Sequence, residues 1–320
     1  MTRPKISVII PAYNAEGFIA EAVSSALAQS WGNLEVLVVD DGSTDGTGKE
    51  CAKLALDGKI RYFATKNRGP NAARNTGIAQ AQGAYLALLD ADDLWEPEKL
   101  LQQMSVFSEH AGTGMVFCDY STFDATGTLA AGKTGCLFRE TEPQTFDKLF
   151  VRNNFILPST VVVGRNVFDL CGAFDESLRG AEDYEMWLRI ARSFAIRGVN
   201  QSLARIREHP GNSSKQVKSM YDNELLVIAL QEPLVSAQRY RSRVAKVNYL
   251  AADKMVCGGK RFGSLRYFRR GFALAPLLVV DQAVIVIRML LGQRAVEKIR
   301  RWLNQTTAPR FLFDQLFKRF

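Results

Sequence analysis

The stretch Tyr85–Trp95, YLALLDADDLW, decides the fold, because an uninterrupted apolar run ends abruptly at three carboxylates. The apolar part, Tyr85–Leu89, predicts a strand buried on both faces of a parallel sheet. Its carboxylates, Asp90, Asp92 and Asp93, then emerge at the strand's carboxyl end, where ligands bind in open α/β sheets. Alternate side chains of an extended backbone share a face, so Asp90 and Asp92 are expected to point the same way. A D-x-D pair placed there suits a hard cation over phosphate oxygens.

The same carboxylates have a purely structural explanation, in which Asp92 or Asp93 caps the N-terminus of a helix. Closely spaced carboxylates repel one another, and a bound cation removes that repulsion. We therefore favour the cation site and keep the helix cap as the alternative.

Apolar, β-branched runs alternate with helical patterns in the first half of the chain. Ile6–Ile10 and Leu34–Val39 are two such runs, each followed by polar residues and a helical pattern. This alternation is typical of βαβ units, so we predict an α/β fold with a Rossmann-like, mostly parallel sheet flanked by helices. Further strands are expected at Ile60–Ala64, Met115–Tyr120 and Ser159–Val163, a loop or hairpin at Ser121–Gly135, and helices at Ala15–Gln29, Asp45–Leu56, Asn71–Gln82, from Glu96-Pro97 onward and at Ala181–Ser193.

Length and charge distribution indicate two parts. A chain of 320 residues suffices for one large domain or two. The pattern is helical from Met220 almost to the end, which places a boundary within Gly211–Ser219 and predicts a first domain at residues 1–215 and a helical region at residues 216–320. The segment Arg239–Phe320 has 18 Lys+Arg against 4 Asp+Glu, a net charge of +14, which leaves −6 for the rest of a chain whose total is +8. The two parts are expected to have different partners.

The basic C-terminal part suits an anionic membrane surface. Ala273–Gly292 is strongly apolar but contains Asp281 and Arg288, and the chain ends in the aromatic and basic FLFDQLFKRF. A spanning helix needs about 20 apolar residues without such charges, so we expect a helix that lies in the interface or packs on a partner. Peripheral membrane attachment and a helical dimerisation or lid element are the two interpretations that remain open.

The cysteines and the N-terminus predict a cytoplasmic protein. The 5 cysteines are scattered, with no C-x-x-C pair, as is typical of free thiols in a reducing compartment. The first apolar segment is too short for a signal peptide and meets Pro11 at once.

Aromatic and basic residues near other strand ends suit a nucleotide. Pro11 and Tyr13 directly follow the first predicted strand, where a tyrosine ring can stack on a base, although an ordinary turn is the simpler explanation of this motif alone. Arg68 and Arg74 lie in NRGPNAARNTG and can contact phosphate or base, because guanidinium is a fixed fork of donors. The structural alternative is that these two arginines simply belong to a solvated loop and the start of a helix.

Two adjacent carboxylates, Asp40 and Asp41, directly follow the second predicted strand. They can accept hydrogen bonds from a base N–H or from ribose hydroxyls, and Gly42 permits the tight turn that this requires. A helix cap by Ser43 or Thr44 is the structural alternative, and both interpretations can hold together.

Two later motifs carry residues suited to proton transfer or metal binding. Glu182 and Asp183 begin an amphipathic helical pattern, where a carboxylate either complements the helix dipole or acts as a general base. His209, one of only 2 histidines, precedes a proline and can bind a metal or a diphosphate, or simply lie at the surface.

Taken together and in order, these motifs resemble the family-2 inverting nucleotide-sugar glycosyltransferases of the GT-A fold. The matching segments are VIIPAYNAEGFI, VVDDGSTDGT, NRGPNAARNTGI, LLDADDLW, GAFDESLRGAEDYEMWLR and REHPGNSS. Each is weak alone, but six in order are highly specific. The resemblance covers Lys5–Ser214 and implies a GT-A type sheet with a C-terminal helical extension.

The resemblance also implies roles for individual residues. The nucleotide would be held by Pro11, Tyr13, Asp40 or Asp41, Arg74 and Asp90. Asp92 would be the direct ligand of Mg²⁺ or Mn²⁺, with His209 approaching the metal or the diphosphate. Asp183 would deprotonate the acceptor hydroxyl as it attacks the anomeric carbon, and one direct displacement would invert the configuration. Glu182 and Trp187 are assigned to the acceptor and sugar side of the pocket.

The family resemblance favours a UDP-sugar donor and a glycan or lipid-linked acceptor, with thymidine and guanosine donors as alternatives. A nucleotidyltransferase also needs carboxylates and a cation, but the usual Gly-rich phosphate loop with a lysine is absent from PAYNAEGF. A non-catalytic polyanion binder, including a nucleic-acid binder, is disfavoured because carboxylates clustered at strand ends would repel phosphate.

Overall fold

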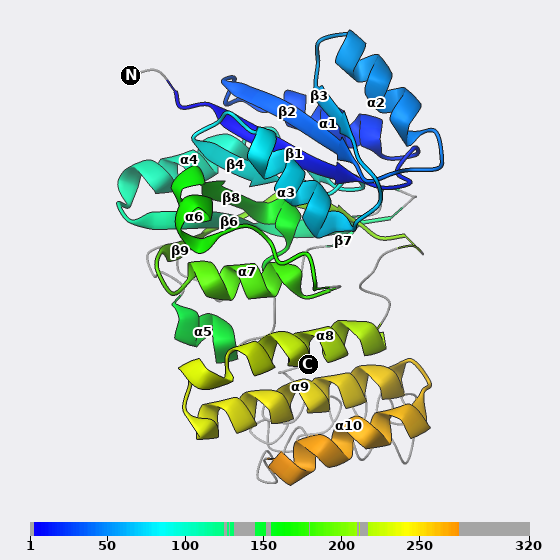
Figure 1. Ribbon diagram of the computed structural model, residues 1–320, viewed down its shortest axis with the longest axis vertical. Coiled ribbons are helices and arrows are strands. Elements are labelled where there is room, and N and C mark those ends of the chain that lie inside the picture. The colour runs from blue at the N-terminus through cyan, green and yellow to red at the C-terminus, as the bar shows by residue number, and fades with distance from the viewer. Residues whose placement is uncertain are drawn as a thin grey trace, which may run out of the picture. The chain divides into compact units, whose positions relative to one another are not determined.

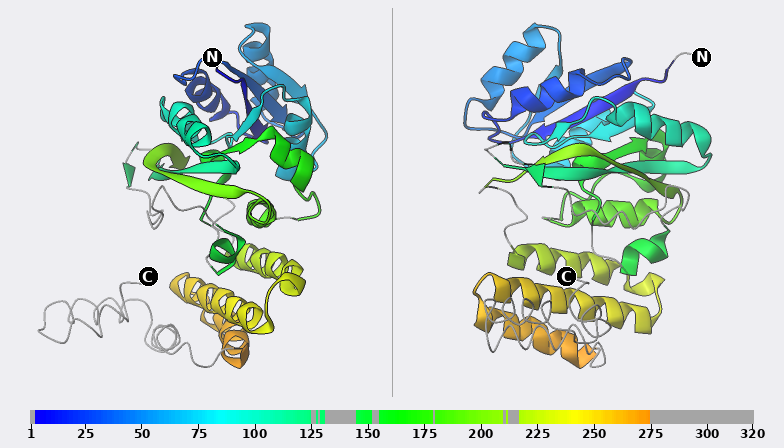
Figure 2. Two further views of the ribbon diagram at one scale, coloured as in Figure 1. Left: turned by 90° about the vertical axis from the view of Figure 1, so that its left-hand side faces the viewer. Right: turned by 180° about the vertical axis from the view of Figure 1, so that it is seen from behind.

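The structure is a computed structural model that describes residues 3–124, 127, 129–130, 145–151, 155–178, 180–209, 211 and 217–274. The chain divides into two compact units, Met1–Asn212 and Ser213–Phe320. The first unit is built around one β-sheet with helices on both faces, and the described part of the second unit is helical (Figures 1 and 2).

Within the described residues of the first unit, the sheet has nine strands in the order β3-β2-β1-β4-β8-β6-β9-β5, with β7 paired to β6. The strands are β1 (Ile6–Ala12), β2 (Leu34–Asp40), β3 (Arg61–Ala64), β4 (Tyr85–Leu88), β5 (Leu94–Trp95), β6 (Thr113–Phe123), β7 (Leu129–Ala130), β8 (Val161–Gly164) and β9 (Ala195–Arg207). Strands β3, β2, β1 and β4 are parallel neighbours. Strand β8 is antiparallel to both β4 and β6. Strand β6 and its parallel partner β9 therefore run in the same direction as β4. The mostly parallel α/β sheet is therefore confirmed.

Helices connect these strands in the order expected for βαβ units. They are α1 (Ile19–Leu27), α2 (Thr47–Leu56), α3 (Pro70–Gln80), α4 (Lys99–Glu109), α5 (Phe146–Val151), the 3₁₀ turn η1 (Pro158–Thr160), α6 (Arg165–Cys171) and α7 (Glu182–Ile190). Several helices begin later than the sequence pattern predicts. For α1, the expected first residue, Ala15, instead donates its N–H to the Thr47 hydroxyl at 2.8 Å.

The observed sheet differs from the predicted one in two respects. Strand β4 is buried, but only its β1 side is parallel, since β8 pairs with it in the antiparallel sense. Strand β9, Ala195–Arg207, was not predicted at all, although it has 13 residues. Its sequence AIRGVNQSLARIR has no long apolar run, because its pairing with β6 contains irregularities and its middle residues are exposed.

Helix α3 packs closely against β1, an inner strand of the sheet whose apolar residues belong to the core. Ile6, Ile9 and Ile10 are fully buried, as expected for a strand covered on both faces. Gly77 of α3 packs directly over Ile9, where an added Cβ would come within 2.4 Å of the isoleucine Cγ2 atom. The close approach of α3 fixes the position of the polar residues on its preceding turns.

A buried lysine lies beneath the β4–β5 loop. Lys99 is fully buried, its Nζ lies 4.1 Å from the centroid of the Trp95 ring, and it donates to Gln103 Oε1 at 2.8 Å. Burial lowers the pKa of Lys99 to about 8 from its ordinary value of 10.5. The charged form is therefore less stable inside the fold than in the unfolded chain.

This lysine predicts a pH dependence of stability. Between pH 8 and 10.5 the unfolded chain keeps a proton on Lys99 that the folded chain has released, so the free energy of unfolding rises with pH across that window. The rise is expected to be about 3 kcal/mol from the shift in this pKa. Urea unfolding at several pH values gives the free energy of unfolding of the wild type and of Lys99→Met, and the rise should be present only in the wild type. Lys49→Met, which changes an exposed lysine, is the control and should behave like the wild type. Parallel curves for wild type and Lys99→Met would contradict the prediction.

The described part of the second unit consists of α8 (Val217–Leu230), the 3₁₀ turn η3 (Glu232–Leu234), α9 (Ala237–Cys257) and α10 (Arg261–Leu274). Inside it, Arg243 forms a buried ion pair with Glu224, and the Tyr267 hydroxyl donates to Asp222 Oδ1 at 2.6 Å. Among the described residues, no helix combines the length and apolar character needed to cross a membrane. Apart from its first two residues, the apolar segment 273–292 lies outside the described residues, as does the C-terminal FLFDQLFKRF.

Candidate functional site

The carboxyl ends of four parallel strands meet at one edge of the sheet. Strand β1 pairs with β2 and β4, and β2 pairs with β3, so the residues that follow them lie along this edge. Pro11 is part of β1, and the Tyr13 ring just beyond it is 52% exposed. Asp40 ends β2, and Asp90 follows β4 after one further residue. An exposed aromatic ring beside buried carboxylates is an arrangement that can accept a nucleotide base and its ribose.

Asp40 and Asp41 are both buried and organise the loops at this edge. Asp40 accepts hydrogen bonds from the Ser43 N–H at 2.8 Å and from the Tyr62 hydroxyl at 3.0 Å. Asp41 accepts from the N–H groups of Arg68 and Gly69, at 2.8 and 2.7 Å. Because a carboxylate has about four acceptor positions, each side chain retains capacity for a ligand.

The turn after β2 differs from the expected helix cap. Gly42 has φ +74, in the left-handed region that favours glycine, as the tight turn requires. The N-cap of α2 is Gly46, with no side-chain hydrogen bond from the cap, so neither Ser43 nor Thr44 caps this helix. Asp45 instead accepts from a backbone N–H of the first turn at 3.0 Å. The capping alternative was wrong because the turn continues beyond the predicted helix start.

The D-x-D carboxylates Asp90 and Asp92 contact different partners. Asp90 Oδ1 accepts a charge-assisted hydrogen bond from Arg74 Nη2 at 2.9 Å. Asp92 Oδ2 lies 2.8 Å from His209 Nε2. The loop after β4 thus joins the arginine of α3 to the histidine that follows β9.

Asp93 is the structural member of the trio. Its buried carboxylate accepts from the Ser159 hydroxyl at 2.6 Å and from the Arg207 N–H at 3.0 Å. Burial, with added repulsion from Asp90 and Asp92, raises the pKa of Asp93 well above its ordinary value. Strand β5 follows this loop, so the helix-cap alternative for Asp92 and Asp93 was wrong. The loop after β4 therefore carries three neighbouring carboxylates, and a bound cation would reduce the repulsion between them.

Arg74 links the loop that carries Asp90 and Asp92 to the start of α7. Its side chain is 6% exposed, and besides Asp90 it contacts Glu182 Oε1 at 3.4 Å and Asn71 Oδ1 at 3.4 Å. Burial works against the charge of the guanidinium, but the carboxylates of Asp90 and Glu182 raise the pKa of Arg74 above its ordinary value. Within the part of the chain that the structure describes, its buried Nε has no hydrogen-bond partner. The guanidinium is therefore held mainly through its two Nη atoms, which contact Asp90, Glu182 and Asn71.

The candidate base lies at the N-terminus of α7. Ala181, the N-cap, has φ +56, a left-handed conformation that costs a non-glycine residue about 1–2 kcal/mol. Glu182 and Asp183 form the first turn, where the helix dipole favours negative charge. Asp183 Oδ1 accepts from the Tyr184 N–H at 2.7 Å. Glu182, paired with Arg74, thus connects this turn to the D-x-D loop.

Arg207 and Phe18 were missed by sequence reasoning, although they hold the Asp92–His209 pair. Arg207 Nε donates to the Asp92 carbonyl oxygen at 2.8 Å, and its guanidinium lies 5.1 Å from the Phe18 ring centroid. The Phe18 and His209 rings are 5.1 Å apart between centroids. The sequence motif REHPGNSS contained Arg207, but only the unpredicted strand β9 reveals where this arginine points.

Trp187, predicted to lie in the acceptor pocket, is instead a core residue. It is 1% exposed, and its indole N–H donates to the Ile156 carbonyl at 3.0 Å. Its ring meets Phe174 edge to face at 6.1 Å between centroids. We correct this assignment, because a ring buried to this degree supports the site from beneath and does not contact an acceptor.

The residues present fit a divalent cation that a substrate helps to hold. Among the described residues no group of three or more His, Cys, Asp or Glu side chains converges as metal ligands. Asp92 and His209 supply two neighbouring ligand atoms, one oxygen and one nitrogen. Mg²⁺ is commonly bound by one or two carboxylates together with substrate phosphates, so two protein ligands are sufficient for this class of site.

Comparison with known proteins identifies relatives of the chain. The sequence profile described as glycosyl transferase family 2 matches residues 7–167. An uncharacterized glycosyltransferase of Rickettsia felis is 32% identical over 72% of this chain, which spans only 38% of that protein. The putative teichuronic acid biosynthesis glycosyltransferase TuaG of Bacillus subtilis is 32% identical, with 64% of this chain and 79% of the relative covered.

Two further similarities concern a named activity and the fold. The UDP-Glc:alpha-D-GlcNAc-diphosphoundecaprenol beta-1,3-glucosyltransferase WfgD of Escherichia coli is 32% identical, with 61% of this chain and 73% of the relative covered. The structure of the mannosyltransferase PcManGT from Pyrobaculum calidifontis, solved with GDP-Man and Mn²⁺, superposes with a TM-score of 0.61 at 18% identity. That superposition covers 100% of this chain and 89% of PcManGT, and it confirms the GT-A fold.

Proposed function

Because the chain belongs to glycosyl transferase family 2, we propose that it is a metal-dependent, inverting hexosyltransferase that uses a nucleoside-diphosphate sugar. The observation that carries this proposal is the position of Arg74. It contacts Asp90 in the D-x-D loop and Glu182 beside the candidate base, at 2.9 and 3.4 Å. A nucleotide-sugar transferase needs its leaving-group site and its base close together, and this arginine joins the two.

We assign the nucleotide to the edge formed by β1, β2 and β4. Tyr13 is exposed for stacking on the base, and Pro11 lies near the end of β1, which directly precedes Tyr13. Asp40 and Asp41 retain acceptor capacity for base or ribose donors. On the diphosphate side, Arg74 provides a positive charge, and its ion pair with Asp90 fixes the orientation of the guanidinium. These six residues form the proposed nucleotide site.

Asp92 and His209 would hold Mn²⁺ or Mg²⁺. When bound, the cation supplies Lewis-acid stabilisation of the departing nucleoside diphosphate. The carbonyl contact from Arg207 fixes the backbone of Asp92, and the Phe18 ring fixes His209. The protein thus presents one carboxylate and one imidazole in a preset orientation.

Asp183 is proposed as the general base. Its carboxylate would take the proton of the acceptor hydroxyl while the hydroxyl oxygen attacks the anomeric carbon from the face opposite the nucleotide. The bond from that carbon to the diphosphate oxygen breaks in the same displacement, which inverts the anomeric configuration. This reaction needs no nucleophilic side chain of the enzyme.

A UDP-sugar donor and a glycan or lipid-linked acceptor in cell-surface polysaccharide or glycolipid synthesis are the proposed substrates. Support comes from WfgD, whose name specifies UDP-Glc and a diphosphoundecaprenol-linked acceptor, and from TuaG, named for teichuronic acid biosynthesis. The GDP-Man bound to PcManGT makes a guanosine donor the main alternative.

Ligand-dependent melting tests this assignment. In the presence of Mn²⁺, one member of a panel of UDP-glucose, UDP-N-acetylglucosamine, GDP-mannose and dTDP-glucose is expected to raise the melting temperature, because a ligand that binds only the folded state stabilises it. Asp92→Asn should reduce the Mn²⁺-dependent part of this shift, whereas Asp57→Asn, a surface change in the α2–β3 loop, should not. Equal shifts with Mn²⁺ and with a chelator would contradict the metal assignment.

We also propose that the helical unit binds anionic membranes. Residues 217–274 contain 11 Lys+Arg and 4 Asp+Glu, a net charge of +7. On α10, Arg266, Arg269 and Arg270 are exposed, as are Leu265 and Phe272. Basic and apolar side chains on one exposed helix suit an interface rich in anionic lipids.

Vesicle flotation measures this binding. The full chain is expected to float with phosphatidylglycerol-containing vesicles at low salt and less at high salt, because exposed charges are screened. The triple change Arg266→Gln, Arg269→Gln and Arg270→Gln should reduce flotation strongly. Equal flotation with neutral phosphatidylcholine vesicles, or none with either kind, would count against it.

A further inference from the structure

Helix α3 presents three polar side chains, Asn71, Arg74 and Asn75, at the i, i+3 and i+4 spacing that places residues on one helix face. Arg74 contacts Glu182, and the two asparagines contact the segment Gly172–Leu178, which leads from α6 toward α7. We propose that Asn75, assisted by Asn71, is a positioning residue that holds this segment and thereby sets the place of the α7 N-terminus. Its catalytic consequence rests on the proposed function.

The side-chain amide of Asn75 forms hydrogen bonds with the backbone of Phe174, in the way that a neighbouring β-strand would. Its Oδ1 accepts the Phe174 N–H at 2.9 Å, and its Nδ2 donates to the Phe174 carbonyl at 2.9 Å. The same Nδ2 also donates to Glu176 Oε1 at 3.1 Å. One side-chain amide therefore satisfies both backbone groups of Phe174, which have no strand or helix partner at this point in the segment.

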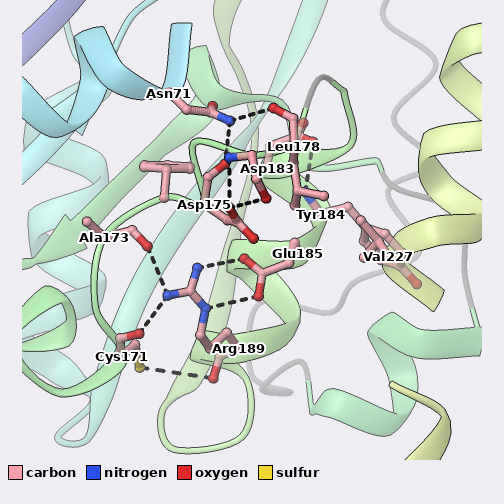
Figure 3. A network of polar contacts seen from close by, with 12 residues as sticks. Asn71, Cys171, Ala173, Asp175, Leu178, Asp183, Tyr184, Glu185, Arg189 and Val227 are labelled. Atoms are coloured by element: carbon pink, nitrogen blue, oxygen red, sulfur yellow. Dashed lines mark hydrogen bonds and ion pairs between the residues drawn. The ribbon is translucent and has the colours of Figure 1, made fainter. Parts of the chain in front are cut away.

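Asn71 holds the end of the same segment. Its side chain is buried, and Nδ2 donates to the carbonyl oxygens of Asp175 at 2.9 Å and Leu178 at 3.2 Å (Figure 3). Both hydrogen bonds from this amide go to backbone carbonyls, so Asn71 fixes the main chain of the segment directly. Ala181 and the first turn of α7 follow within a few residues.

Helix α7 holds the segment from the other direction. Arg189 Nη1 donates to the carbonyls of Cys171 at 2.7 Å and Ala173 at 2.9 Å. Glu185, one turn earlier, orients this arginine through bonds of 3.0 and 2.6 Å (Figure 3). The segment is thus bonded to α3 and α7 at the same time, so it transmits the position of one helix to the other.

The Phe174 ring joins these contacts to the core. Its centroid lies 5.8 Å from the Arg74 guanidinium and 6.1 Å from the Trp187 ring. Movement of Phe174 would therefore disturb both the arginine that contacts Asp90 and the helix that carries Asp183. Misplacing a reacting group by about 1 Å can reduce a rate by about 100-fold.

Two substitutions of Asn75 separate positioning from donor binding. With UDP-glucose and Mn²⁺, we expect Asn75→Ala to lower kcat for donor hydrolysis by about 10- to 100-fold while KM stays within about twofold. Hydrogen exchange of the Phe174 amide should accelerate in Asn75→Ala. It should stay slower in Asn75→Asp than in Asn75→Ala, because the aspartate keeps an acceptor oxygen. Gln80→Ala, an exposed change on the same helix, should alter neither measurement.

The outcomes are distinguishable. An unchanged kcat in Asn75→Ala, or a rise in KM at constant kcat, would overturn the positioning role. Unchanged exchange at Phe174 would overturn the structural half of the proposal. If the wild type hydrolyses no nucleotide sugar, the proposed function fails, whereas the exchange measurement still decides whether Asn75 holds the segment.

Discussion

Asp183→Asn is expected to reduce sugar transfer by about 10²–10⁴-fold, the contribution typical of a positioned general base. Asparagine keeps the size of the side chain and an acceptor oxygen for the Tyr184 N–H, but it cannot take the acceptor proton. The loss should appear in kcat, while the melting shift produced by UDP-glucose and Mn²⁺ should persist. Steady-state kinetics of nucleoside diphosphate release, together with melting curves, provide the measurement.

A matched control for this change is Asp169→Asn. Asp169 is an exposed aspartate of α6, and its substitution should leave both kcat and the melting temperature near the wild-type values. Full transfer activity in Asp183→Asn would place the base elsewhere. Glu182, the adjacent carboxylate, would then be the next residue to substitute.

Arg74→Met is expected to lower the free energy of unfolding by about 3–5 kcal/mol, as breaking a buried ion pair on one side does. The change leaves the carboxylates of Asp90 and Glu182 without the cation between them. Burial already raises the pKa of Asp90 above its ordinary value, and Arg74 opposes that effect. Removing the arginine therefore favours a neutral Asp90 in the proposed leaving-group site, and activity should fall with stability.

Urea unfolding and donor hydrolysis together test this role. Arg74→Lys keeps the charge but not the planar fork, so it should recover part of the stability and little of the activity. Arg61→Met is the control, because it removes a more exposed partner of Glu35 near the amino ends of the strands. A loss in Arg74→Met no larger than that of Arg61→Met would show that Arg74 does not hold the site together.

The first half of the fold could be predicted from the sequence because its central strands are mostly apolar. Strands β1, β2 and β4 lie inside the sheet, and their burial is reflected in largely apolar runs that can be recognised in the sequence. Strand β9 is different, since it pairs irregularly and exposes its middle residues. No simple period in its sequence indicates a strand, and the positions of Arg207 and His209 were hidden with it.

Within the site, the sequence indicated the residue types but not their partners. The stretch YLALLDADDLW could not show that Asp90 contacts Arg74 while Asp93 binds the Ser159 hydroxyl, because both contacts cross long separations in the chain. Likewise, the periodicity of α7 did not distinguish the core residue Trp187 from a pocket residue. Contacts between distant segments depend on strand order. Here the antiparallel strand β8 pairs with β4, which brings Ser159, just before β8, to the loop after β4.

The most direct test is to identify the phosphate-containing product formed from a nucleotide sugar. After incubation of the protein with UDP-glucose, UDP-N-acetylglucosamine or GDP-mannose and Mn²⁺, ion-exchange chromatography separates nucleoside diphosphate from pyrophosphate. A glycosyltransferase with the site described above should release nucleoside diphosphate from at least one donor, and Asp92→Asn should abolish that release. In a parallel incubation with UTP, glucose 1-phosphate and Mn²⁺, release of pyrophosphate, together with no nucleoside diphosphate from any nucleotide sugar, would contradict sugar transfer and indicate a nucleotidyltransferase.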